Sequence, residues 1–156
     1  MNVLKEDIDQ SRTETTMTVQ TSRFGEITVD SERVISLLSP FLGFPESTRF
    51  ILKSHGPKSP FMWLQSLDNP QLAFVVLPAA LTGLDYRPEI PRQIGKDLMI
   101  TGDSDREILL ILTIPKNNPK EMTANLLGPI VLNPGKRLAV QVVLDPQKYD
   151  PCQRLF

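Results

Sequence analysis

The sequence has few of the residues from which catalytic and metal sites are built. Its 156 residues include one cysteine, Cys152, and one histidine, His55. A Ser-His-Asp or Cys-His arrangement would have to use His55, which stands in a Gly/Pro turn and which we expect at the surface. A Cys/His zinc site needs three or four such ligands, more than the chain holds. A Gly-rich phosphate loop and a dinucleotide fingerprint are also missing from the sequence.

An excess of charge of one sign is missing as well. The chain carries 17 basic and 18 acidic residues, so its formal net charge is −1. This balance gives no electrostatic reason to expect binding to nucleic acid or to a membrane. The richest aromatic stretch, residues 61–67, contains no Lys or Arg. That disfavours direct RNA binding, because RNA-binding barrels interleave aromatic with basic side chains.

Long apolar runs and cysteine pairs do not occur either. No run approaches the roughly 18 apolar residues that span a bilayer, and the N-terminus lacks the apolar core of a signal peptide. One cysteine forms no internal disulfide, which fits a reducing compartment. We therefore expect a cytoplasmic protein. Residues 1–17 are polar and mixed in charge, so we expect a flexible N-terminal tail, followed by a single β domain over residues 18–156.

Short apolar runs predict about eight strands. The run 109–114 is apolar on both faces and is stopped by Pro115, so it predicts a strand buried on both sides. In the run 138–144, apolar residues alternate along one face. The linker 68–71 between two β-rich runs predicts a hairpin. The other predicted strands cover residues 24–29, 34–38, 61–67 and 72–77 and a run that begins at Phe50.

Helices are predicted to be short, because the chain has 14 prolines against eight glycines. Residues 86–98 hold at most a short helix starting at Pro91. Residues 118–121 predict one helical turn, with Asn118 as N-cap and Glu121 completing a variant of the capping box. No βαβ rhythm occurs. The expected fold is all-β and mostly antiparallel, a small β-barrel-like or sandwich domain with one or two short helical turns.

Aromatic side chains are the candidate anchors for a protein partner, since they are favoured in interface hot spots. Most of them are nevertheless expected in the core. In the loop 39–45 we expect Phe41 and Phe44 to plug one end of the core rather than to form an exposed binding loop. The candidate anchors are Phe41, Phe44, Trp63, Tyr86 and Tyr149.

A carboxylate cluster supports the alternative function. Asp103, Asp105 and Glu107 alternate along the chain, so on a strand they would share one face. Such a face could hold a divalent cation or act as an acid/base pair in a small β-barrel enzyme or ligand-binding domain. The calcium-loop pattern is incomplete, and we favour a solvated hairpin rim. The expectation is that the chain is not an enzyme.

Several stretches, in order, resemble the FliW family of bacterial flagellar assembly factors. The resemblance covers about residues 20–150, and its most specific part is Thr-Ala-Asn-Leu followed by Pro-Ile-Val. The chain departs from the family in the loop 40–44, where Pro-Phe-Leu-Gly-Phe stands in place of Gly-Leu-Pro-Gly-Phe. The matching stretches are residues 22–27, 42–44, 63–67, 72–76, 113–115, 122–126, 129–133 and 141–144.

The resemblance implies a cytoplasmic, non-enzymatic protein with a β-barrel-like fold and no cofactor. Members of the family bind CsrA, an RNA-binding translational repressor, and antagonise it allosterically, away from its RNA site. They also bind flagellin, and the two partners compete. When flagellin is exported, the freed protein captures the repressor and flagellin translation resumes. The implied partners are therefore a CsrA-type regulator and flagellin, without direct nucleic-acid or membrane contact.

Four residues are predicted to lie on or beside a partner surface, because they are polar or large and stand in irregular segments. They are Tyr86, Glu89, Met122 and Asn125. For Asn125 a second interpretation is equally open, in which its side chain caps backbone groups inside a tight turn.

Overall fold

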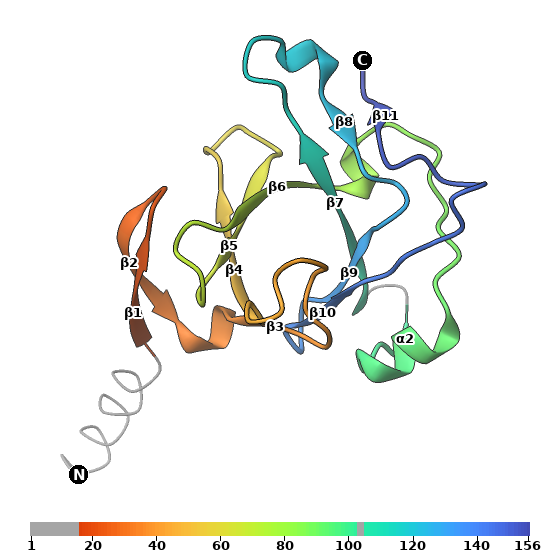
Figure 1. Ribbon diagram of the computed structural model, residues 1–156. Coiled ribbons are helices and arrows are strands. Elements are labelled where there is room, and N and C mark those ends of the chain that lie inside the picture. Colours follow the sequence, from red (N-terminus) through yellow and green to blue (C-terminus); the bar gives the residue numbers. More distant parts are fainter. Residues whose placement is uncertain (1–15, 103–104) are drawn as a thin grey trace, which may run out of the picture.

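Seven strands close into a β-barrel in the computed structural model, which describes residues 16–102 and 105–156. Figure 1 shows the barrel end-on. The order around the wall is β3-β4-β5-β6-β7-β9-β10, and β10 pairs with β3 to close the ring. That closing pair is parallel, and the other neighbours in the ring are antiparallel. The wall strands are β3 (Ile35–Leu37), β4 (Arg49–Ser54), β5 (Met62–Ser66), β6 (Ala73–Pro78), β7 (Glu107–Thr113), β9 (Ile130–Asn133) and β10 (Leu138–Gln141).

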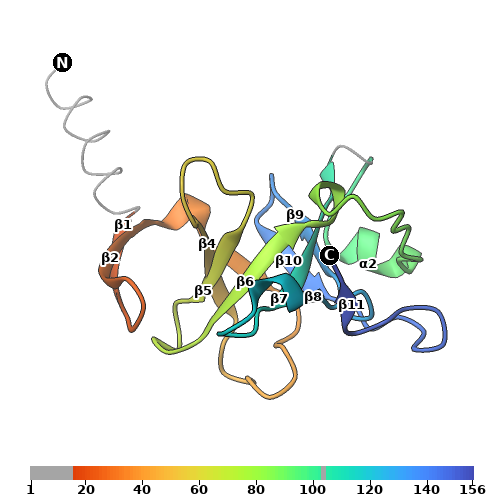
Figure 2. The same cartoon turned by 90° about the horizontal axis from the view of Figure 1, so that it is seen from above.

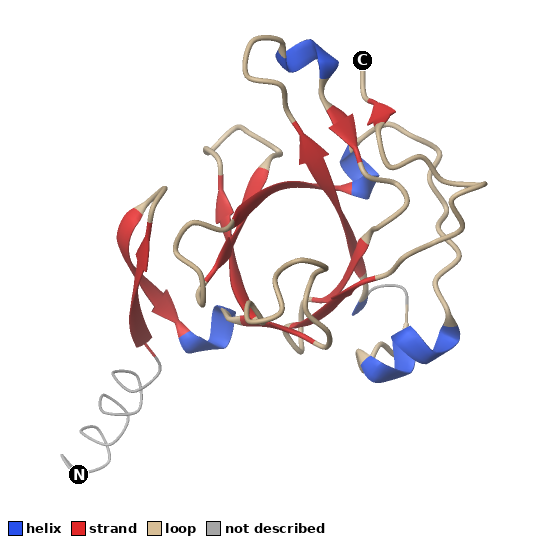
Figure 3. Cartoon of the chain, in the orientation of Figure 1, coloured by secondary structure: helices blue, strands red, loops and turns tan. Residues whose placement is uncertain are grey.

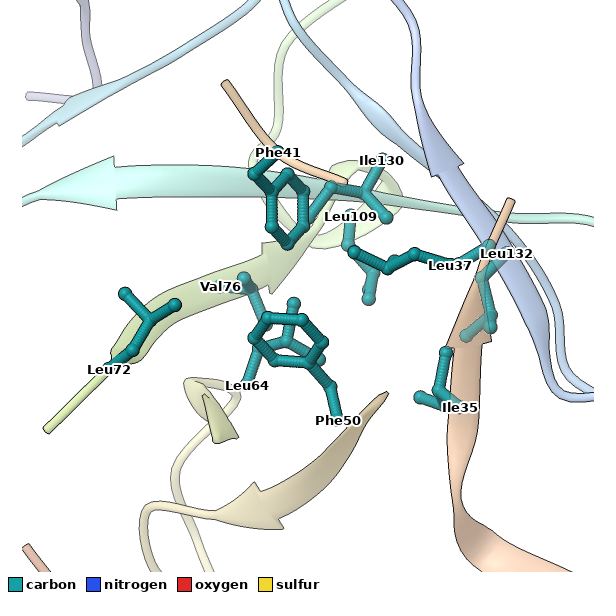
Figure 4. Packing of buried hydrophobic residues seen from close by; sticks show 11 residues of the cluster. Ile35, Leu37, Phe41, Phe50, Leu64, Leu72, Val76, Leu109, Ile130 and Leu132 are labelled. Atoms are coloured by element: carbon teal, nitrogen blue, oxygen red, sulfur yellow. The ribbon is translucent and has the colours of Figure 1, made fainter. Parts of the chain in front are cut away.

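The barrel interior is filled by side chains from every wall strand (Figure 4). Phe41 enters from the loop 39–45 and is 4% exposed. Its ring centroid lies 5.4 Å from that of Phe50 and 5.1 Å from that of Phe74, both in edge-on geometry. Phe44 is partly buried against the same cluster. The prediction that these two phenylalanines plug the core is confirmed, and so is the all-β, barrel-like fold.

Strand β7 is buried on both faces, as its sequence predicts. Leu109 points into the barrel and joins the interior cluster. Leu110 and Leu112 point outward and join a second cluster with Met122 and Ala124. The strand pairs with β6 and β9 in the wall, and near its end with β8 (Thr123–Ala124). A strand that is covered on both sides in this way needs the continuous apolar run seen in the sequence.

A hairpin of β1 (Thr16–Thr21) and β2 (Gly25–Asp30) packs against the outside of the wall. Its inner face contacts Ile51 and Leu67. The 3₁₀ turn η1 (Ser31–Arg33) leads from the hairpin into β3. Strand β1 was not predicted, and it includes residues 16 and 17 of the expected tail; the rest of that tail lies outside the described residues.

Short helical elements connect the strands (Figure 3). The turn η4 (Pro119–Glu121) confirms the predicted helical turn, but its expected cap is wrong: the Asn118 side chain makes no capping hydrogen bond. The backbone N–H of Glu121 donates to the carbonyl oxygen of Asn118, at 3.0 Å, and not to its side chain. A further turn, η2 (Ala79–Leu81), follows β6, and β11 (Gln153–Arg154) pairs with β8 beyond the barrel.

The helix α2 (Arg92–Asp97) lies outside the wall, on the side away from β1 and β2 (Figures 1 and 2). It begins one residue after the predicted Pro91. The four alternating residues of the run 138–144 pack together in its cluster, as predicted. Strand β10 nevertheless ends at Gln141. The next residue opposite it, Pro129, has no N–H to donate. Its carbonyl oxygen accepts one hydrogen bond, from the backbone N–H of Val142 at 2.9 Å.

Candidate functional site

Tyr86 is held between two parts of the chain that are distant in sequence. Its hydroxyl donates to the carbonyl oxygen of Leu126 at 2.6 Å. Its ring meets that of Tyr149 edge-on, with centroids 5.9 Å apart. Burial raises the pKa of Tyr86 above its ordinary value, and the proximity of Tyr149 raises it further. Tyr86 is therefore a neutral hydrogen-bond donor, and its side chain is half-buried.

Glu89 forms a second contact between the same two parts of the chain. Its carboxylate lies 3.4 Å from Nζ of Lys148, and both side chains are largely exposed. The Tyr149 hydroxyl donates to the carbonyl oxygen of Arg87 at 3.2 Å. We call the surface formed by Tyr86, Glu89, Lys148 and Tyr149 the tyrosine seam. The seam joins the segment after β6 to the segment after β10, so two of the four predicted site residues lie together.

Asn125 organises a turn rather than projecting from it. Its Oδ1 accepts hydrogen bonds from the backbone N–H groups of Leu127 and Gly128, at 3.1 and 3.0 Å. A Cβ on Gly128 would lie 2.8 Å from Nε2 of Gln141, which donates to the Gly128 carbonyl oxygen at 3.0 Å. The capping interpretation of Asn125 is therefore confirmed. Its contact with a partner stays a prediction.

Met122 is 7% exposed and packs in the same outer cluster as Tyr86. It also lines a surface hollow of about 670 Å³. We call this hollow, on the outside of β5 and β6, the aromatic hollow. It is lined by Arg23, His55, Phe61, Trp63, Ala73, Phe74, Val75, Leu112, Ile114, Pro119 and Met122.

Trp63 is the centre of an aromatic group at the edge of this hollow. The Arg23 guanidinium carbon lies 3.9 Å from the Trp63 ring centroid, close enough for a cation–π contact. The Phe24 ring meets Trp63 edge-on, at 6.2 Å between centroids, and His55 lies 6.4 Å away. Trp63 was among the aromatic anchors considered from the sequence, but Arg23 and His55 were not predicted as its neighbours. His55 is exposed in the turn after β4, as predicted.

The carboxylate cluster of the alternative function is not assembled in the described residues. Asp105 precedes β7 and accepts a hydrogen bond from the Thr101 hydroxyl, whereas Glu107 is the first residue of the strand. The two therefore do not alternate along one strand, and Asp103 lies outside the described residues. Across residues 16–102 and 105–156, no three His, Cys, Asp or Glu side chains are grouped to hold a metal ion. In that same part of the chain, no helix has the length and apolarity to cross a membrane.

The geometry defines a class of small, closed β-barrels in which the interior is packed and the accessible apolar hollow lies outside the wall. Comparison with known proteins identifies the family. A family model described as FliW protein matches residues 18–155. The chain therefore belongs to the FliW family, and the resemblance drawn from its sequence is confirmed.

Relatives and a solved structure agree with this assignment. A flagellar assembly factor FliW of Geobacter sulfurreducens is 41% identical over 140 residues, which cover 90% of this chain and 87% of the relative. One of Leptospira biflexa is 43% identical over 117 residues, covering 75% of this chain and 76% of the relative. A crystal structure of the flagellar assembly factor FliW superimposes with a TM-score of 0.82 at 31% identity, covering 90% of this chain and 97% of the other.

Proposed function

We propose that this chain is a cytoplasmic, non-catalytic flagellar assembly factor that binds a CsrA-type translational regulator and flagellin. The observation that carries the proposal is the family match, which extends over residues 18–155 and so includes nearly all of the described chain. The relatives named above are flagellar assembly factors. In this function the protein needs no cofactor and makes no direct contact with nucleic acid or membrane.

The partner surface that we propose includes the tyrosine seam. Glu89 is its accessible charge, since the Glu89 side chain remains 73% exposed in the ion pair with Lys148. Tyr86 offers part of its ring, because its hydroxyl is engaged with Leu126. Met122 packs in the same cluster as Tyr86, and Asn125 sets the turn that carries Leu126. Tyrosine and a nearby charge are typical of the residues that dominate protein–protein interfaces.

Regulation would follow from competition between the partners. While flagellin occupies the protein, the translational regulator is free to repress flagellin synthesis. When flagellin leaves the cell, the protein binds the regulator and synthesis resumes. In thermodynamic terms, each partner lowers the apparent affinity of the other by mass action. The protein then acts as a sensor of unexported flagellin without chemistry of its own.

The test is isothermal titration calorimetry of the purified chain against the regulator and the flagellin of the same organism. Both are expected to bind, and a saturating amount of one should suppress binding of the other. Failure of the wild-type chain to bind either protein would overturn the proposed function. A pull-down from the native cytoplasm, which should recover at least one of the two partners, is an independent check.

Variants locate the surface. Tyr86→Ala and Glu89→Lys should each weaken binding of at least one partner by about ten-fold, as expected for anchor residues. Glu32→Lys in η1 is the matched control, because Glu32 is also exposed and lies beside β2, away from the seam. If both seam variants fold and bind both partners with unchanged affinity, Tyr86 and Glu89 do not belong to the partner surface.

A further inference from the structure

We propose that the aromatic hollow is a docking site for a protein segment that carries an apolar side chain next to a carboxylate. The hollow lies over β5 and β6, where Trp63 and Val75 are directly paired across the two strands. The turn at Arg23 borders it on one side, and the connection from Ile114 to Met122 borders it on the other. The proposal concerns the chemistry of this surface and goes beyond the identity of the two partners proposed above.

The floor of the hollow is suited to an apolar side chain. Val75, Leu112 and Met122 line it together with the aromatic rings. Ile114 at its border is 38% exposed, although isoleucine is among the residue types most often buried. Burying apolar surface of this kind is the general driving force for association. A partner side chain placed here would cover apolar atoms that the rest of the chain leaves in contact with water.

The charged side chain in the lining of the hollow is a cation. The lining contains Arg23 but no Asp or Glu. Nearby, Nζ of Lys53 lies 5.0 Å from the centroid of the Phe24 ring. Among the described residues, neither Arg23 nor Lys53 forms an ion pair with a carboxylate. Both cations are positioned by aromatic rings instead, so a carboxylate on the partner would complement them.

A single-stranded nucleic acid is the other anionic occupant to consider, and the geometry favours a protein segment. Base stacking needs a free aromatic face, but the Arg23 guanidinium occupies one face of Trp63 at 3.9 Å. Beside the rings of Phe61 and Phe74, the lining includes the apolar side chains of Val75, Leu112, Ile114 and Met122, which suit Leu, Ile or Val. The chain as a whole has a net charge of −1, which does not favour a polyphosphate backbone.

Trp63 supplies a direct readout, since it is the single tryptophan of the chain. The probes are two short synthetic peptides with the same central pair of leucines. Asp and Glu flank the leucines in one peptide, and Lys flanks them in the other. The acidic peptide is expected to change Trp63 fluorescence saturably and to bind at least about ten-fold more tightly than the basic one, an effect that added salt should weaken.

Charge reversal distinguishes docking from a general effect. Arg23→Glu should weaken the acidic peptide by about ten-fold and strengthen the basic one, a switch that simple loss of packing does not produce. Arg92→Glu is the matched control, because Arg92 is exposed on α2 at another side of the barrel, and it should leave both affinities unchanged. If Arg23→Glu does not fold, Lys53→Glu provides the same test.

Three results would overturn the proposal. The first is that the acidic peptide leaves Trp63 fluorescence unchanged at millimolar concentration. The second is that the two peptides bind equally, or that Arg23→Glu and Arg92→Glu behave alike. The third is that a single-stranded oligonucleotide binds the hollow more tightly than the acidic peptide. None of these results depends on the regulator or on flagellin, so a failure here is separate from a failure of the proposed function.

Discussion

Tyr86→Phe isolates a single hydrogen bond of the tyrosine seam. The substitution keeps the ring, and with it the edge-on contact with Tyr149, but removes the hydroxyl that donates to the Leu126 carbonyl oxygen at 2.6 Å. That carbonyl is partly buried and would lose its partner. A partly buried acceptor left without a donor costs about 1–2 kcal/mol in the free energy of unfolding. Urea denaturation of the two proteins measures this difference directly.

Tyr149→Phe is the matched control for this measurement. Its hydroxyl donates to the Arg87 carbonyl oxygen at 3.2 Å in an exposed position, where water can replace it, so the expected loss is below about 0.5 kcal/mol. For a domain of this size, the Tyr86 variant should also lower Tm by about 3–6 °C. Equal stability of Tyr86→Phe and wild type, or a larger loss for Tyr149→Phe, would refute the argument.

The pH dependence gives a second, independent signature of Tyr86. Burial and the proximity of Tyr149 raise its pKa in the folded state above the ordinary value of 10.0. The neutral phenol is therefore favoured by folding, and its contribution is complete below pH 10 and decreases as the pH rises above it. The wild-type advantage over Tyr86→Phe should shrink there by at most about 1 kcal/mol per pH unit, since the side chain is only partly buried. Parallel stability curves between pH 9 and about 11 would contradict this assignment.

Three further substitutions test individual contacts that stabilise the fold. Gly128→Ala should lower the free energy of unfolding, measured by urea denaturation, by about 1–2 kcal/mol. The added Cβ would lie 2.8 Å from Nε2 of Gln141 and displace the hydrogen bond that this nitrogen donates to the Gly128 carbonyl oxygen. Most of that cost should vanish in a Gln141→Ala background. Phe41→Ala should cost about 3–5 kcal/mol, since it empties the end of the barrel core, and an unchanged urea midpoint would contradict this. Burial alone would raise the pKa of Asp68, but hydrogen bonds from the Arg49 side chain and the neighbouring backbone lower it below 3.8. Asp68 therefore stabilises the protein above that pH and loses the effect as the pH falls, so Asp68→Asn should flatten the acid limb of the stability curve.

The strands could be predicted where burial leaves a local pattern in the sequence. Strand β7 is covered on both faces and reads as a continuous apolar run, and the run 138–144 alternates because one face is covered by α2 and its neighbours. Strand β1 was missed because its alternation rests on two apolar residues, Met17 and Val19, and continues a polar N-terminal stretch. Closure of the barrel also could not be predicted from the sequence. It depends on the parallel pairing of Ser36 with Leu138, residues about one hundred positions apart, and no local pattern encodes such a pairing.

The two surfaces differ in how far their contacts could be predicted from the sequence. The Asn125 turn was predictable, because an asparagine followed by a glycine three residues later can cap backbone groups locally. The contact between Arg23 and Trp63 was not. It exists because the β1–β2 hairpin docks on the wall, where the backbone N–H of Ser22 donates to the Pro70 carbonyl oxygen at 2.9 Å. A cation–π pair across two elements has no signature in the sequence of either one.

Met122 lines one surface and packs beneath a residue cluster shared with the other, and this decides how its variants are interpreted. Its side chain lines the aromatic hollow and packs in the same cluster as Tyr86. Because it is 7% exposed, most of its surface is used for folding, and a truncation would disturb the hollow, the seam and the core together. Arg23 contacts the hollow alone, and Glu89 contacts the seam alone. Variants of Arg23 and Glu89 therefore assign an effect on binding to one surface, whereas a Met122 variant that weakens binding identifies neither.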